Sequence, residues 1–178
     1  QIHSKKIHFI KKLPKNKLVG DGLITNTKGL ALGILTADCA PIIFFDPKKK
    51  IIGAAHAGWR GAYKKISKNM TSHFKKRGSK LKDLYVIIGP CISQNNYEVK
   101  QDLIKKFLNQ SLDNKRHFRR QGNKIYFDLK GYLFQQLKRN GIKNIEIIKK
   151  DTFYPKNNFF SARRSLKNKI DDYGRNIS

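Results

Sequence analysis

The sequence predicts an α+β fold. Short runs of Ile, Val, Leu and Phe, bounded by Gly, Pro and Asn, indicate several strands. Between some of these runs, apolar residues recur every three or four positions, which is the pattern of amphipathic helices. Strands and helices do not alternate in sustained βαβ order, so a doubly wound parallel sheet is not expected. The chain of 178 residues has no internal repeat or linker, and we expect one domain over residues 1–178.

The expected strands lie in apolar segments that end at turn residues. In chain order these segments are residues 7–13, 23–29, 30–46, 51–58, 84–92, 124–128 and 145–150. Segment 30–46 is interrupted at Asp38 and Pro41, so it predicts two buried strands joined at the Asp38-Cys39 step. Segment 51–58 consists of small residues, which allow neighbouring backbone or a ligand to approach closely.

The expected helices follow from apolar residues at helical spacing. They cover residues 59–77, 97–109 and 129–139, and polar or aromatic loops are expected over 111–123 and 151–165. Gly78 follows the first helix as a C-cap. In the second helix, Val99, Leu103 and Phe107 would face the core.

The composition limits the classes of protein that fit. The formal net charge is +27, but the basic residues are mostly lysine and are spread along the chain. We therefore expect nonspecific polyanion binding at low salt and no specific nucleic-acid partner. No apolar run reaches the roughly 18 residues that a membrane span needs, and the first residues lack the apolar core of a signal peptide. Only two cysteines are present, so we expect a soluble cytoplasmic protein without membrane attachment. The oligomeric state is not predicted.

Cys39 and His56 are the first candidates for chemistry, because each stands at the end of an apolar run. Small residues flank His56, so its ring is not shielded, and Arg60 follows near the expected helix start, where anions bind. A thiolate and an imidazole are ligands that zinc prefers. The alternatives are a buried cysteine and a core histidine. A third ligand would come from the remaining histidines or Cys91; of the histidines, His73 and His117 are expected to face solvent.

Several motifs occur together in one order. They are "GDGLITN" at 20–26, "LTADCAPI" at 35–42, "GAAHAGWRG" at 53–61, "IGPCI" at 88–92, "YEV" at 97–99 and "DTFYPKNNFFSARR" at 151–164. Over essentially the whole chain, these motifs closely resemble the YfiH-type laccase-domain family, which is also labelled as multicopper polyphenol oxidases. The resemblance implies an α/β sandwich of mixed sheets flanked by helices, similar to YfiH and the deamidating-toxin cysteine hydrolases.

The resemblance also implies an activity. Such proteins are zinc-dependent purine nucleoside phosphorylases that use adenosine, inosine, guanosine and methylthioadenosine with phosphate, and they also deaminate adenosine. Carried over to this chain, the zinc ligands are His3, Cys39 and His56. Three protein ligands leave a fourth position open, which is the arrangement of catalytic zinc sites. Copper is the less favoured metal.

Phosphorolysis requires a cationic pocket for phosphate, which points to further site residues. Arg60 is expected to bind phosphate, and Arg163 and Arg164 are additional candidates for substrate binding, with surface charge in a lysine-rich chain as their alternative. Asp38 would orient a ligand or act as general acid or base beside Cys39, and its alternative is a capping residue in a turn. Cys91 is not assigned to the metal.

Relatives carry a substantial segment before the motif that contains His3, and this chain is expected to lack it. Three other functions are alternatives. A cysteine hydrolase would use Cys39 and His56 as nucleophile and base without a metal. A copper-dependent phenol oxidase would need several histidine-rich sites, but the chain has five histidines and no His-x-His pair. A basic RNA-associated protein would lose affinity steeply with salt.

Overall fold

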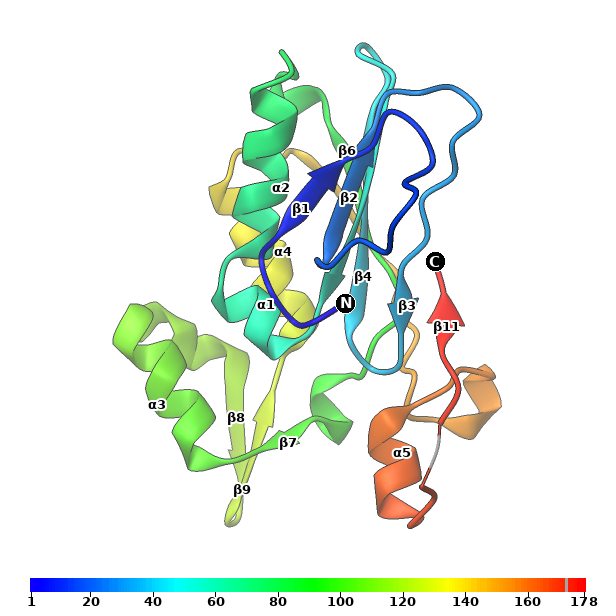
Figure 1. Ribbon diagram of the computed structural model, residues 1–178. Coiled ribbons are helices and arrows are strands. Elements are labelled where there is room, and N and C mark those ends of the chain that lie inside the picture. Colours follow the sequence, from blue (N-terminus) through cyan, green and yellow to red (C-terminus); the bar gives the residue numbers. More distant parts are fainter. Residues whose placement is uncertain (172) are drawn as a thin grey trace.

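Figure 1 shows the computed structural model of the chain, which describes residues 1–171 and 173–178. The strands are β1 (Ile7–Phe9), β2 (Gly22–Thr25), β3 (Leu35–Thr36), β4 (Ala40–Asp46), β5 (Ile51–Ala57), β6 (Tyr85–Ile88), β7 (Glu98–Val99), β8 (Phe118–Gln121), β9 (Lys124–Phe127), β10 (Asn144–Ile147) and β11 (Asn176–Ile177). The helices are α1 (Trp59–Tyr63), α2 (Ile66–Lys75), α3 (Gln101–Gln110), α4 (Leu129–Arg139) and α5 (Ala162–Lys167). This mixture of helices and sheets confirms the predicted α+β class.

A six-stranded mixed sheet forms the centre of the fold. Its strand order is β1-β2-β5-β4-β6-β10: the four central strands β2, β5, β4 and β6 pair antiparallel with one another, and the edge strands β1 and β10 pair parallel with β2 and β6. The pairing of β4 with β5 sets Pro41 opposite His56. Two smaller sheets, β11-β3 and β7-β9-β8, lie beside the central one.

The core lies between the central sheet and the helices α1, α2 and α4, which cover one of its faces (Figure 1). Small residues in β5 make this packing possible. A Cβ added to Gly53 would lie 2.8 Å from Met70 Cε and 3.0 Å from Phe74 Cε2, both on α2. The expectation that segment 51–58 admits a close neighbour is therefore correct, and that neighbour is a helix.

The opposite face of the central sheet is exposed at β4 and β6, which corrects the expectation of fully buried strands. Phe44 and Ile88 are buried, whereas Phe45 and Tyr85, on the other face, are 44% and 55% exposed. Side chains alternate between the two faces of a strand, and helices cover only one face here, so only alternate residues reach the core.

Two predicted helices differ from the structure. The helix expected over 59–77 breaks at Lys65, which has a left-handed backbone with φ of 62°, so that α1 and α2 are separate. The helix expected over 97–109 begins only at Gln101, because residues 98–99 form β7 and pair with β9. Val99 therefore belongs to a strand, since pairing with β9 replaces the first helical turn.

Both predicted loops contain regular structure. Segment 111–123 includes a 3-10 helix (Leu112–His117) and β8, and segment 151–165 includes a 3-10 turn (Pro155–Asn157) and the start of α5. His117 is only 5% exposed, because it packs edge-on against Tyr132 and its Nε2 bonds Gln135 Oε1. The expectation that His117 faces solvent was wrong, and His73 is half-buried. No helix in the described part of the chain is long and apolar enough to cross a membrane.

Candidate metal centre

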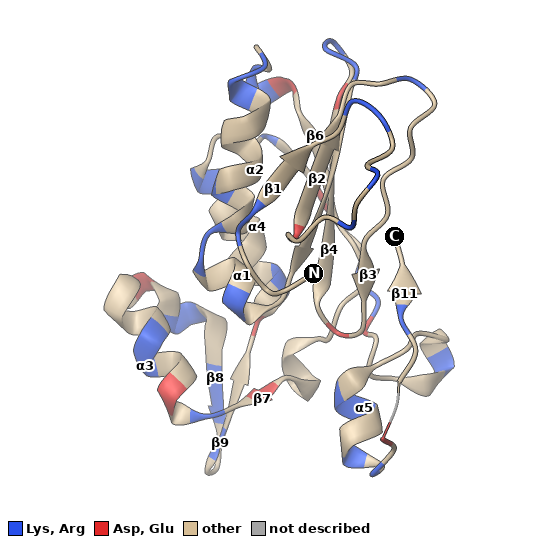
Figure 2. Ribbon diagram, viewed as in Figure 1, with Lys and Arg blue, Asp and Glu red and all other residues tan. Residues whose placement is uncertain are grey.

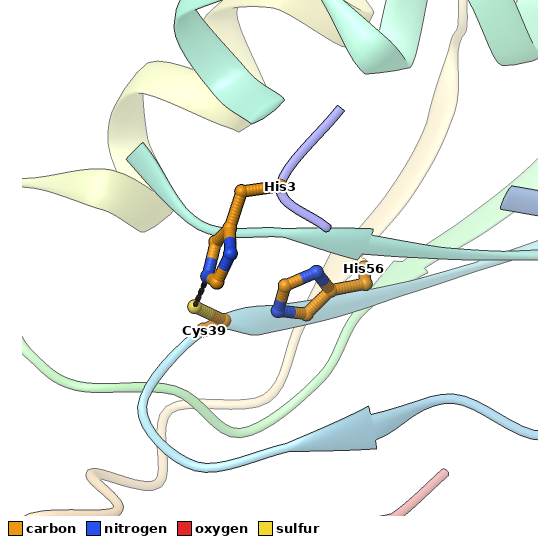
Figure 3. A group of neighbouring side chains, drawn as sticks. All are labelled: His3, Cys39 and His56. Atoms are coloured by element: carbon orange, nitrogen blue, oxygen red, sulfur yellow. Dashed lines mark hydrogen bonds between the residues drawn. The ribbon is translucent and has the colours of Figure 1, made fainter. Parts of the chain in front are cut away.

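His3, Cys39 and His56 come together at one end of the central sheet (Figure 3). Cys39 directly precedes β4, His56 belongs to β5, and His3 lies in the segment before β1. One ligand atom from each of the three side chains lies within 4.8 Å of the others. The distance from Cys39 Sγ to His3 Nε2 is 3.8 Å, and the two imidazole rings are 4.8 Å apart, centroid to centroid. Segments distant in sequence thus supply one compact group.

The three side chains fit a zinc ion. In a tetrahedral zinc site, typical bond lengths put a sulfur and a nitrogen ligand about 3.5 Å apart, close to the separation of Cys39 and His3. Gly58 leaves room beside them, because an added Cβ would lie 2.7 Å from Cys39 Sγ and 3.0 Å from His3 Cδ2. A thiolate with two imidazoles is a donor set that zinc prefers, and copper also binds these ligand types.

The pKa values of the three candidate ligands are compatible with a bound metal cation. Burial, with the nearby carboxylates of Asp38 and Asp21, raises the pKa of the Cys39 thiol to about 12. A bound divalent ion would offset this cost, because its positive charge stabilises the thiolate. Burial lowers the pKa of both His3 and His56, so both imidazoles are neutral at neutral pH, as metal ligation requires.

Asp21 joins two of the candidate ligands, and the sequence interpretation did not recognise this. Its Oδ1 accepts a hydrogen bond from His56 Nδ1 at 2.9 Å and another from the His3 amide at 2.9 Å. Its Oδ2 accepts from the Ser4 amide and hydroxyl. Burial by itself raises the pKa of Asp21, but hydrogen bonds from Ser4, His56 and Ile2 outweigh it and lower the pKa to about 2. The available signal was a carboxylate held between two glycines in "GDG", which was interpreted only as a turn and a motif.

Asp38 lies beside the group, with its carboxylate directed to the C-terminal part of the chain. Its Oδ1 accepts from Thr152 Oγ1 at 2.7 Å, and its Oδ2 accepts from the Arg163 amide at 2.6 Å. Its φ of 80° is left-handed, an uncommon conformation for a residue other than glycine. These bonds join the "TADC" turn to the segment that begins at Asp151.

The three candidate arginines have different surroundings. Arg60 is exposed, and its guanidinium lies over the Trp59 ring at 4.8 Å. Arg163 lies over the Tyr97 ring at 5.5 Å and donates to the Glu98 carbonyl. Arg164 donates to the carbonyls of Thr152, Phe153 and Phe159. Arg164 is therefore engaged with its own loop, whereas Arg60 and Arg163 border open space.

Two cavities, one of them lined by Cys39, share Tyr97 and Arg163 in their linings. The smaller, of about 170 Å³, includes Cys39 in its lining. The larger, of about 400 Å³, is also lined by Trp59. A volume of this size is typical of small-molecule sites. Of the three candidate ligands, Cys39 thus borders a space that a small ligand can enter.

Comparison with known proteins identifies the family. The sequence profile described as multi-copper polyphenol oxidoreductase laccase matches residues 1–178. The chain belongs to this laccase family. Curated relatives include a purine nucleoside phosphorylase of Rickettsia conorii, 38% identical over 159 residues, which cover 88% of this chain and 65% of the relative. Another is a purine nucleoside phosphorylase of Rickettsia prowazekii, 36% identical, with 93% and 69% covered.

Solved structures agree with this assignment to the laccase family. The Bacillus licheniformis hypothetical protein YfiH superposes with a TM-score of 0.88 at 30% identity, over 99% of this chain and 70% of that one. YlmD from Geobacillus stearothermophilus superposes with a TM-score of 0.87 at 28% identity, over 99% and 69%. The predicted resemblance to the YfiH-type laccase domain is confirmed. The chain spans about two thirds of the length of these relatives.

Proposed function

We propose that this chain is the zinc-binding part of a purine nucleoside phosphorylase. Its substrates would be adenosine, inosine, guanosine and methylthioadenosine, each with phosphate, and it would also deaminate adenosine. One observation carries the proposal: three ligand-type side chains converge, and one of them, Cys39, borders a cavity, in a chain whose relatives are named purine nucleoside phosphorylases. His3, Cys39 and His56 would hold the zinc. We further propose that residues 1–178 form one domain, located in the cytoplasm, where the two free thiols would stay reduced.

Zinc, when bound, would supply a positive charge that polarises a substrate oxygen and activates water near neutral pH. Side chains of the protein would bind and orient the substrate and exchange protons with it. Tyr97 and Arg163 would form the wall against which the nucleoside lies, because both line the two cavities. Asp38 would hold this wall in place through the Arg163 amide, or exchange a proton with the substrate.

Phosphorolysis requires phosphate to meet C1′ of the ribose while the purine departs. Cationic side chains at the mouth of the cavity would bind the phosphate and stabilise the charge that develops. Arg60 is suited to this role, because it is exposed and its positive charge contributes to lowering the pKa of His3, a candidate ligand. Arg163 is the second candidate. Arg164 already donates to three carbonyls, and its proposed contact with substrate would require some of those bonds to be released.

The first experiment is an assay of the zinc-loaded chain with adenosine, in the presence and absence of phosphate. Chromatography would separate adenine, inosine and hypoxanthine. We expect phosphate-dependent adenine and phosphate-independent inosine, both lost in Cys39→Ala. Cys91→Ala is the matched control, since Cys91 is a fully buried thiol outside the group, and this variant should retain turnover if it folds. A folded, zinc-containing wild-type chain without turnover would contradict the proposal.

The metal-independent cysteine hydrolase is the second candidate function. A nucleophilic cysteine needs a thiolate and an adjacent base. Here the thiol pKa is raised, and the contact of Cys39 Sγ is with His3 rather than His56. These observations favour the metal-dependent function. Activity that survives exhaustive chelation would favour the hydrolase, and metal analysis of the purified chain would distinguish zinc from copper.

A further inference from the structure

The carboxylate of Asp21 contacts both segments that supply imidazole to the candidate metal centre. On one side it accepts from His56 Nδ1 at 2.9 Å. On the other side it accepts from three consecutive backbone amides, those of Ile2, His3 and Ser4, and from the Ser4 hydroxyl. Asp21 is 1% exposed, so water does not compete for these bonds. Both carboxylate oxygens are therefore engaged.

At His56, this contact selects the tautomer. An ionised carboxylate only accepts hydrogen bonds, so Nδ1 of the neutral ring must carry the proton. The lone pair is then on Nε2, which is free to bind a metal. A ring without this partner could rotate or exchange tautomers. A carboxylate that accepts from the non-ligating nitrogen raises the affinity of histidine for metals.

At His3, the same contact stabilises an uncommon backbone conformation. His3 has a φ of 54°, in the left-handed region, which is unfavourable for residues other than glycine. This conformation lets the amides of residues 2, 3 and 4 converge on one anion. The segment has further anchors, including the bonds between Gln1 and Leu35, but only Asp21 bonds the His3 amide in the structure described.

We propose that Asp21 is the positioning residue of the metal centre: one carboxylate bonds the ring of His56 and the backbone of His3, and so places both histidines close to Cys39. The inference rests on the proposed zinc-dependent function. It does not make Asp21 a ligand, since its oxygens are already engaged with His56 and the amides of residues 2–4.

Asp21→Asn tests the proposal. The side chain keeps its shape, but it has one accepting oxygen, and its NH2 group cannot accept. If the NH2 group takes the place of Oδ1, His56 and the His3 amide lose their acceptor. If it takes the place of Oδ2, the Ser4 amide loses its acceptor. We expect zinc affinity, measured by competition with a chromophoric chelator, to fall about 10- to 100-fold. The absorption spectrum of the Co2+-loaded variant should also change, because the ligand geometry is relaxed.

Asp46→Asn is the matched control. Asp46 is equally buried and accepts from two backbone amides, but it lies at the far end of β4 from Cys39. This variant should bind zinc within about twofold of wild type. NMR of 15N-labelled histidine in the metal-free chain provides a further readout: the Nδ1–H tautomer of His56 should dominate in wild type and in the control, and lose its dominance in Asp21→Asn.

Ser4→Ala keeps the test decisive if Asp21→Asn does not fold. It removes the hydroxyl bond alone, so a smaller loss of zinc affinity is expected. Equal affinities and cobalt spectra for wild type and the site variants would overturn the proposal, as would an equal loss in the Asp46 control. Wild-type zinc binding without nucleoside turnover would contradict the proposed function and leave the role of Asp21 supported by the affinity data. A folded wild-type chain that binds neither ion would overturn both.

Discussion

At the scale of single residues, Gly58 determines whether a metal can enter the group. The φ of Gly58 is −80°, which any residue can adopt, so the backbone does not require glycine here. What matters for the metal site is that Gly58 has no side chain. The position of its missing Cβ is 2.7 Å from Cys39 Sγ and 3.0 Å from the His3 ring. A methyl group there would move one or both candidate ligands.

We therefore expect Gly58→Ala to fold but to lose zinc binding by at least tenfold, measured by chelator competition. The substitution restricts the unfolded chain, so the free energy of unfolding should not fall for backbone reasons. Gly33→Ala is the control, since a Cβ there would be 3.8 Å from Ile177 in ordinary contact. Wild-type zinc affinity in a folded Gly58→Ala chain would contradict this account of the site.

Asp151 illustrates how a buried carboxylate links stability to pH. Burial by itself raises its pKa, but bonds from Ser93, the Phe153 amide and Asn96 outweigh it and hold the pKa below the usual 3.8. A lowered pKa in the folded state means that the unfolded chain binds the proton more readily. The stabilisation is therefore present above about pH 4 and is lost as pH falls through the folded-state pKa.

Asp151→Asn should thus cost about 1–3 kcal/mol of unfolding free energy at pH 7, and less at acid pH. Urea denaturation at pH 7, 5 and 3.5 would measure the difference from wild type. The gap should narrow at the lowest pH, because the carboxyl of the unfolded wild-type chain then takes up a proton and stabilises the unfolded state. A constant gap across this range would show that the charge of Asp151 does not contribute.

At the scale of elements, the start of α5 separates two neighbouring arginines. Ser161 caps the helix by accepting from the Arg164 amide, and the side chain of Arg164 turns back to the carbonyls of its own loop. Arg163 instead projects beside Tyr97 and the cavity wall. Adjacent residues of one type thus have different surroundings.

Arg164→Ala should therefore lower stability by about 2–3 kcal/mol, because it removes charge-assisted bonds to three carbonyls. Arg163→Ala should leave the melting temperature nearly unchanged and raise KM for nucleoside or phosphate about tenfold, the equivalent of about 1.4 kcal/mol. Thermal melts and steady-state kinetics on both variants would check this. The reverse pattern, with Arg164 affecting KM and Arg163 affecting stability, would contradict the proposed roles.

At the scale of the whole molecule, Lys and Arg outnumber Asp and Glu and are spread over helices and loops, while the central strands carry few of them (Figure 2). There are 39 basic and 12 acidic residues. Several acidic side chains are buried and bonded to backbone amides, including Asp21, Asp38 and Asp46, and so they neutralise little of the surface. The chain should attract polyanions without a defined site.

Binding to heparin should be tight at low salt and should weaken by about 10³-fold between 50 and 200 mM salt, because counterion release drives it. Fluorescence anisotropy with a labelled heparin fragment would measure this. Cys39→Ala should behave identically, since the metal centre does not contribute. Binding that persists at high salt, or that depends on Cys39, would indicate a specific polyanion site instead.

The sequence by itself determined the α+β class, the positions of most strands, and the membership in the laccase family. It also identified Cys39 and His56 as candidates, because both stand at the ends of apolar runs, and the resemblance to the family added His3. Periodicity failed at Lys65 and Val99, where backbone conformation and strand pairing overrode the helical pattern. It also failed at His117, whose burial depends on Tyr132 and Gln135.

Only the tertiary structure decided how the candidate residues relate to one another. Strand pairing brings His56 next to the end of β4, and Asp21 joins the segment of His3 to that strand end. The exposed face of the central sheet was likewise invisible, since the residues of β4 and β6 are apolar on both sides. Contacts between segments far apart in sequence depend on how the whole chain packs, so the spacing of residues within one segment does not predict them.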